Sequence, residues 1–175
     1  MTFNTKRPPP TGRPPASSIP SPRSLKDALT EAQAIAGGGL SRTSSLPGSV
    51  APGTGRKTVM LVDQDAEMRA RIRAQLESFY DIVEARDGME ALEIAPTLPS
   101  LAMIVSETTM PRLDGFTLAK LVRNVPALKR VQIMFLSTRD SAQDVTQALV
   151  LGACQYVVKK TPVPEIVAKI RKIVV

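Results

Sequence analysis

Four polar positions in the second half of the chain are of types that can act together on a charged group. Asp63, Glu107, Ser137 and Lys159 each follow a short apolar run. Carboxylate oxygens are the ligands that a hard cation such as Mg²⁺ prefers, and a lysine with a hydroxyl group suits a phosphoryl group. The sequence therefore predicts a cleft of carboxylates, a hydroxyl and an ammonium group, if the fold brings these positions together.

Composition limits the chemistry that such a cleft can perform. The chain has no histidine, the commonest general base and metal ligand, so catalysis would depend on Asp, Glu, Lys, Ser or Thr. Cys154 is the single cysteine, which excludes an internal disulfide. No apolar run reaches the ~18 residues of a membrane span, and the N-terminus lacks a signal-peptide core. We therefore expect a cytoplasmic protein.

Five repeats of strand and helix must position the four polar residues. From residue 58 onward, apolar runs alternate with amphipathic segments, a pattern typical of a parallel sheet covered on both faces. The expected strands are 58–62, 80–84, 101–105, 131–136 and 154–158, and the expected helices are 66–78, 88–95, 114–124, 141–151 and 164–173. Ligands of such folds bind outside the carboxyl ends of the strands. The sequence thus predicts an α/β fold, a doubly wound five-stranded parallel sheet with the polar residues at that edge.

Residues 1–57 follow a different pattern. They hold nine of the fifteen prolines, seven of the ten glycines and a net charge of +6, whereas residues 58–175 carry +1. Such a composition cannot bury enough apolar area to offset chain entropy, so we expect a disordered basic leader before the folded domain. Within the leader, residues 24–36 can form a short amphipathic helix. This helix is either transient or a docking element that folds on a partner.

Short motifs at the strand ends resemble those of the response-regulator receiver family, typified by the chemotaxis regulator CheY. VMLVD at 59–63 resembles the family's first strand with its acidic end, and MPRLDG at 110–115 matches the turn after its phosphorylated position. LS at 136–137 matches its switch hydroxyl, and YVVK at 156–159 matches its switch aromatic residue and lysine. The resemblance covers residues 58–175 and implies a flavodoxin-like sheet with strand order 2-1-3-4-5.

The resemblance also implies a chemistry for the cleft. In the family, an aspartate four residues before the Met-Pro proline takes a phosphoryl group from a partner histidine. Mg²⁺ is held by that aspartate and by an acidic pair after the first strand; the matching positions here are Glu107, Asp63 and Gln64. Phosphorylation then draws the switch residues inward, here Ser137 and Tyr156. The face formed by the fourth helix, fifth strand and fifth helix changes shape as a result.

Three departures from the family pattern affect this cleft. Glu107 replaces aspartate and carries its carboxylate roughly 1–1.5 Å further, although a 1 Å misplacement can cost about 10²-fold in rate. Gln64 replaces one acid of the pair and weakens a metal site made of Asp63 and Glu107. Asp65 is a poor substitute, because successive residues of an extended segment point to opposite sides. Lys160 replaces the usual proline, so a cis peptide bond there would cost about 2.5–4 kcal/mol.

These departures predict a pseudo-receiver that acts as a phosphorylation-independent signalling adaptor and is not an enzyme. No cofactor is expected, and Mg²⁺ is expected only if the cleft is still competent. Glu107 with Lys159 either imitates the phosphorylated state or forms a salt bridge that neutralises the cleft. Two alternatives stay open: a functional phosphoacceptor in a phosphorelay, and weak nucleic-acid binding through the basic leader. The leader has almost no aromatic residues, so nucleic acid is the less favoured partner.

The expected partners are proteins of a bacterial signalling pathway. The docking surface that the resemblance implies is the face of the fourth helix, fifth strand and fifth helix, including Arg139, Lys160 and the exposed part of Tyr156. Residues 24–36 are a second candidate docking element. Tyr156 is alternatively a packing residue, and Cys154 is expected to be a small packed or edge residue.

Overall fold

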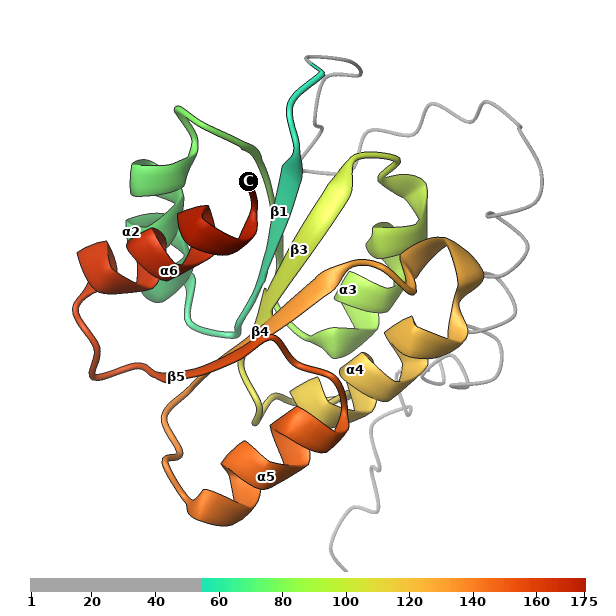
Figure 1. The fold of residues 1–175 in the computed structure, drawn as a ribbon, viewed down its shortest axis with the longest axis vertical. Helices are drawn as coiled ribbons and strands as arrows, with labels where there is room; N and C mark the ends of the chain where they lie inside the picture. Colours follow the sequence, from blue (N-terminus) through green and yellow to red (C-terminus); the bar gives the residue numbers. More distant parts are fainter. Residues whose placement is uncertain (1–54) are drawn as a thin grey trace, which may run out of the picture.

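A computed structural model describes residues 55–175, and the parallel sheet predicted for them is confirmed (Figure 1). Its strands are ordered β2-β1-β3-β4-β5, as the resemblance implies. The strands are Thr58–Val62 (β1), Asp81–Ala85 (β2), Leu101–Ser106 (β3), Gln132–Ser137 (β4) and Gln155–Val158 (β5). The helices are Ala66–Leu76 (α2), Gly88–Ile94 (α3), Gly115–Asn124 (α4), Ala142–Val150 (α5) and Val163–Ile173 (α6), with 3₁₀ turns at Ala95–Thr97 and Pro126–Leu128. The helix predicted at 24–36 lies outside the described residues, and the leader and its boundary stay predictions.

Helices cover both faces of the sheet (Figure 1). α2 and α6 lie on one face, and α3, α4 and α5 lie on the other. Successive residues of β1 point into the apolar cores on opposite faces of the sheet. Met60 and Val62 belong to the core beneath α3–α5, and Val59 and Leu61 belong to the core beneath α2 and α6. This alternation follows from side chains that point to opposite sides of a strand buried on both faces.

The start of β2 was predicted one residue too early, and the end of α2 explains the difference. The N–H groups of Phe79 and Tyr80 donate to the Leu76 carbonyl (2.8 and 3.0 Å), so Tyr80 belongs to the turn that ends the helix. The Tyr80 hydroxyl also donates to the Val174 carbonyl (3.1 Å) near the end of α6. Tyrosine suits a strand by propensity alone, so apolar alternation could not reveal this turn.

Candidate functional site

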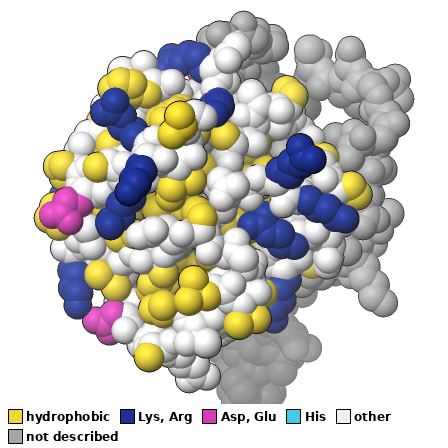
Figure 2. Space-filling view, in the orientation of Figure 1, with side chains coloured by type: hydrophobic (Ala, Val, Ile, Leu, Met, Phe, Trp, Pro, Cys, Tyr) yellow, Lys and Arg dark blue, Asp and Glu magenta, His cyan; other side chains and the backbone are white. Residues whose placement is uncertain are grey.

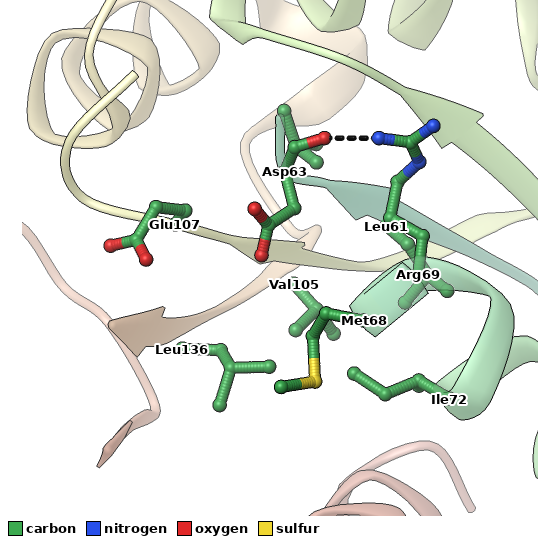
Figure 3. Close-up of a pocket in the computed structure, with 9 residues that line it drawn as sticks. Leu61, Asp63, Met68, Arg69, Ile72, Val105, Glu107 and Leu136 are labelled. Atoms are coloured by element: carbon green, nitrogen blue, oxygen red, sulfur yellow. Dashed lines mark hydrogen bonds between the residues drawn. The ribbon is translucent and has the colours of Figure 1, made fainter. Parts of the chain in front are cut away.

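The carboxyl ends of four strands bring the predicted polar residues together in one cleft. Asp63 follows β1, Glu107 follows β3, Ser137 ends β4 and Lys159 follows β5. The two acids lie at the ends of adjacent strands, above an apolar floor that includes Val105 (Figure 3). Both acids and Ser137 are at most 5% exposed. Charges in this cleft therefore interact more strongly than they would in water.

Lys159 forms ion pairs with both acids of the cleft. Its Nζ lies 2.6 Å from Asp63 Oδ2 and 2.9 Å from Glu107 Oε2. Burial lowers the pKa of Lys159, but the hydrogen bonds and charges of the two carboxylates outweigh burial and raise the pKa above its ordinary value. The lysine is therefore charged and interacts with two carboxylates at once.

The second oxygen of Glu107 is also occupied. Glu107 Oε1 accepts the N–H of Thr108 (2.6 Å), the hydroxyl of Thr108 (3.0 Å) and the N–H of Thr109 (3.3 Å). Burial raises the pKa of the Glu107 carboxyl, but the nearby Ser137 hydroxyl and the Lys159 ammonium group, with its charge, hold that pKa below its ordinary value. Glu107 is therefore ionised at neutral pH.

The backbone after β3 is fixed by the turn that starts α4. The Gly115 N–H donates to the Thr108 carbonyl (3.0 Å). A Cβ on Gly115 would lie 2.1 Å from the Glu107 carbonyl oxygen, so this close approach requires glycine. Asp114 caps α4 by accepting the Thr117 N–H (2.9 Å).

Asp65 is exposed, and its side chain contacts the start of α2 instead of the cleft residues. Its carboxylate accepts the N–H groups of Glu67 and Met68 (3.0 and 3.1 Å) and caps α2. Gln64 is exposed. Asp63 Oδ1 accepts the Asp65 N–H (2.9 Å). The pair after β1 thus supplies one carboxylate to the cleft.

Substituting Asp65 with alanine is expected to lower the free energy of unfolding by about 1 kcal/mol, the usual effect of losing a helix cap. Urea unfolding measures this loss, and Asp65→Asn, which can still cap, is the control. Amide NMR signals of Glu107 and Lys159 should be unchanged in both variants. Large changes in these signals would contradict the separation of Asp65 from the cleft.

Thr108 is a cleft residue that sequence reasoning missed. Its hydroxyl oxygen lies 2.5 Å from Ser137 Oγ, and the two residues are 2% and 0% exposed. Ser137 Oγ also accepts the Arg139 N–H (3.1 Å). The sequence feature that could have indicated this role is a hydroxyl residue directly after Glu107. Strand alternation does not give the direction of a side chain beyond the end of the strand.

Tyr156 contacts the loop after β4. Its hydroxyl donates to the Arg139 carbonyl (2.8 Å), and its ring lies against that of Phe135, with ring centroids 6.3 Å apart. The residue is half-buried. Tyr156 therefore packs on the core and also holds the loop, and its role as a switch stays a prediction.

Lys160 lies outside the cleft. Its Nζ pairs with Asp140 (2.9 Å), and both side chains are exposed. No cis peptide bond occurs in residues 55–175, and Lys159 reaches both acids from this loop. Cys154 is exposed beside β5, and its thiol donates to the Ile133 carbonyl (3.2 Å).

The surroundings of the two acids do not fit a Mg²⁺ site, because other protein groups already contact their carboxylate oxygens. Each of the four carboxylate oxygens of Asp63 and Glu107 accepts a hydrogen bond or forms an ion pair within the protein. Arg69, a second cation, lines the same hollow, donates to the Asp63 carbonyl and pairs with Glu84 (Figure 3). Among residues 55–175, no group of three or more His, Cys, Asp or Glu side chains could hold a metal ion. Because Mg²⁺ requires near-octahedral oxygen ligands, it would have to displace Lys159 to bind here.

The folded part of the chain resembles known proteins. The profile of the response regulator receiver domain matches residues 59–171. The gliding motility regulatory protein of Myxococcus xanthus is 34% identical over 119 residues, which are 67% of this chain and 15% of that protein. Protein PilG of Pseudomonas aeruginosa is 30% identical over 115 residues, which are 65% of this chain and 84% of PilG.

Solved structures show the same fold. The chemotaxis protein CheY4 of Vibrio cholerae matches with a TM-score of 0.63 and 26% sequence identity, covering 67% of this chain and 98% of CheY4. The chain thus corresponds to most of PilG and CheY4 but to a small part of the Myxococcus protein.

Proposed function

The chain belongs to the response regulator receiver family, and on that premise we propose that it is a signalling adaptor that binds a protein partner without being phosphorylated. One observation carries the proposal: protein donors already occupy every carboxylate oxygen of Asp63 and Glu107. A phosphoryl group and its Mg²⁺ would need these same oxygens. In this proposal the chain performs no catalytic step.

The length of the Glu107 side chain supports a single persistent arrangement of the cleft. Glutamate extends the carboxylate roughly 1–1.5 Å further than aspartate, and the carboxylate meets Lys159 directly (2.9 Å). It meets Ser137 through the Thr108 hydroxyl. A carboxylate carries less charge than a phosphoryl group, about −1 against −1.5 to −2. The cleft therefore needs no added group to neutralise Lys159 or to give Ser137 an inward partner.

The surface proposed for the partner is the face formed by α5, β5 and α6. On α5, Leu149 is 63% and Val150 81% exposed. Figure 2 shows apolar side chains on this side of the molecule with Lys and Arg around them and few acidic groups. Arg139 and Lys160 are exposed on the same face. Arg139 and Lys160 pair with Asp144 and Asp140 within the domain (both 2.9 Å), so the exposed apolar side chains of α5 are what an amphipathic partner segment would cover.

The relatives suggest the setting of this interaction. They are named for gliding motility and chemotaxis, which supports a partner in a bacterial signalling pathway. Within residues 55–175, none of the helices has the length and apolar character to cross a membrane. The proposal takes the interaction to occur in the cytoplasm, where partners of a bacterial signalling pathway would be met.

Titration of the full chain with Mg²⁺ and then beryllofluoride, which imitates the phosphoryl group, tests the proposal. Amide NMR signals of Asp63, Glu107, Ser137 and Lys159 are expected to show no saturable change. The Gln64→Asp, Glu107→Asp double variant is the matched positive control. It restores a second acid and shortens the first, so its signals should move with both additions.

A saturable response of the unaltered chain would overturn the proposal. Shifts that spread from Asp63 to Tyr156 and α6 would instead identify a working phosphoacceptor. Labelling of Glu107 by acetyl phosphate in the presence of Mg²⁺ would then establish the acceptor directly.

A further inference from the structure

A series of hydrogen bonds leads from Glu107 to Tyr156 with Thr108 next to the acid. The Thr108 hydroxyl lies 3.0 Å from Glu107 Oε1 and 2.5 Å from Ser137 Oγ. The Arg139 N–H donates to Ser137 Oγ (3.1 Å), and the Arg139 carbonyl accepts the Tyr156 hydroxyl (2.8 Å). The series thus connects the Glu107 carboxylate in the cleft with the surface loop after β4.

Counting protons fixes the direction of these bonds. The ionised Glu107 carboxylate can only accept, so the Thr108 hydroxyl donates its single proton to Glu107. The Ser137 hydroxyl must then donate to Thr108, and the Ser137 oxygen accepts the Arg139 N–H. Every bond from Arg139 inward therefore points toward the carboxylate, an arrangement in which each bond polarises and strengthens the next.

The position of Thr108 is fixed by its backbone. The Thr108 N–H donates to Glu107 Oε1 (2.6 Å), and its carbonyl accepts the Gly115 N–H (3.0 Å). In the part of the chain that the structure describes, no buried side-chain nitrogen or oxygen lacks a hydrogen-bond partner. Loss of the Thr108 hydroxyl would remove the acceptor that Ser137 uses in this buried cleft.

We propose that Thr108 is a positioning residue whose hydroxyl transmits the charge of Glu107 to Ser137. Through Arg139 it then fixes the loop at 138–141 and Tyr156 without any bound group. Ser137 already has, in Thr108 Oγ1, the inward partner that phosphorylation supplies in the family. This inference rests on the proposed function, because it explains how a persistent arrangement of the cleft reaches the partner-binding face.

NMR of the full chain without added ligand tests the role of Thr108. Thr108→Val keeps the shape of the side chain and removes the hydroxyl, whereas Thr108→Ser keeps the hydroxyl. In Thr108→Val, amide exchange at Arg139 is expected to accelerate by about tenfold, consistent with the loss of one hydrogen bond. The ring signals of Tyr156 should also move. Thr108→Ser should resemble the unaltered chain. The Thr117 hydroxyl contacts Asp114 and not the cleft, so Thr117→Val should leave the signals of Arg139 and Tyr156 unchanged.

A second comparison separates transmission from local packing. Glu107→Gln removes the charge, and it should shift the signals of Arg139 and Tyr156 in the unaltered chain but not in Thr108→Val. Equal shifts in both backgrounds would overturn the proposal, because the charge would then act through another route. If Thr108→Val does not fold, Ser137→Ala removes the same hydrogen bond between Thr108 and Ser137. The effect of Glu107→Gln on Arg139 and Tyr156 is then compared in that background instead.

The outcome is independent of the test of the proposed function. A response of the unaltered chain to Mg²⁺ and beryllofluoride would overturn phosphorylation independence, but neither compound is present in the Thr108 experiment. Unequal shifts in that experiment would support the role of Thr108 whichever result the titration gives.

Discussion

Replacement of Lys159 by methionine is expected to lower the free energy of unfolding at pH 7 by about 3–5 kcal/mol, the cost of leaving a buried charge without its partner. Lys159 lies within 2.9 Å of both Asp63 and Glu107, which are 5% and 3% exposed. Methionine fills a similar volume, so the loss reports on charge more than on packing. Urea unfolding followed by circular dichroism measures the change.

Lys160→Met is the matched control. Lys160 pairs with Asp140 at the same 2.9 Å, but its side chain is 74% exposed and that of Asp140 66% exposed. An exposed ion pair contributes about 0–1 kcal/mol. Losses of equal size in the two variants would show that Lys159 is not needed to neutralise the cleft.

The contribution of Glu107 to the pH dependence of stability is expected to change sign in the Lys159→Met variant. In the unaltered chain the pKa of Glu107 is lowered, so its contribution is present above its unfolded pKa and is lost as pH falls through the folded pKa. Without Lys159, burial outweighs the remaining hydrogen bonds and raises the pKa. The variant then gains stability relative to the unaltered chain as pH falls. Unfolding curves recorded between pH 7 and 4 should converge, and a constant difference would contradict this account.

Gly115→Ala is expected to cost about 3 kcal/mol or more, at the upper end of what overpacking costs, or to prevent folding. The added Cβ would lie 2.1 Å from the Glu107 carbonyl oxygen and 3.0 Å from Ser106 Oγ. Because the Gly115 N–H also holds the Thr108 carbonyl, any relief of this clash displaces the strand end that carries the acid. Urea unfolding gives the loss, and amide signals of Glu107 and Thr108 should report the displacement.

Gly152→Ala separates this clash from the ordinary cost of replacing glycine. Gly152 has a φ of +73°, but the nearest atom to its added Cβ would be Arg123 Nε at 3.8 Å. The expected loss is therefore only about 1–2 kcal/mol, from the left-handed backbone conformation. If Gly152→Ala costs as much as Gly115→Ala, close contact with Glu107 is not the reason for glycine at 115.

The sequence predicted the fold and the meeting of the cleft residues for the same physical reason. Apolar runs separated by helical segments require parallel strands, and parallel strands place their carboxyl ends at one edge. The proximity of four residues could therefore be predicted from their positions directly after the apolar runs: Asp63, Glu107, Ser137 and Lys159. Alternation places Asp65 opposite Gln64 but on the side of Asp63, so the outward position of Asp65 comes instead from the cap that it forms on α2.

The contacts of Thr108 could not be predicted in this way. They depend on the turn between β3 and α4, which is set by the Gly115 contact and not by any periodic pattern. The half-buried position of Tyr156 depends on the loop at 138–141, whose path is likewise set by hydrogen bonds across the fold. A strand end can be predicted from the sequence, whereas the direction of the next side chain requires tertiary structure.

The pairing of α2 with α6 on one face of the sheet has a consequence for the order of folding. These helices come first and last in the described domain, and both pack on the same apolar layer, which includes Val59, Leu61 and Met103. As the chain leaves the ribosome, β1, α2, β3 and β4 emerge before α6, so this layer stays partly uncovered until the last helix arrives. Contacts between such distant segments also slow folding. A chain cut before residue 163 is expected to expose an apolar sheet face and to aggregate.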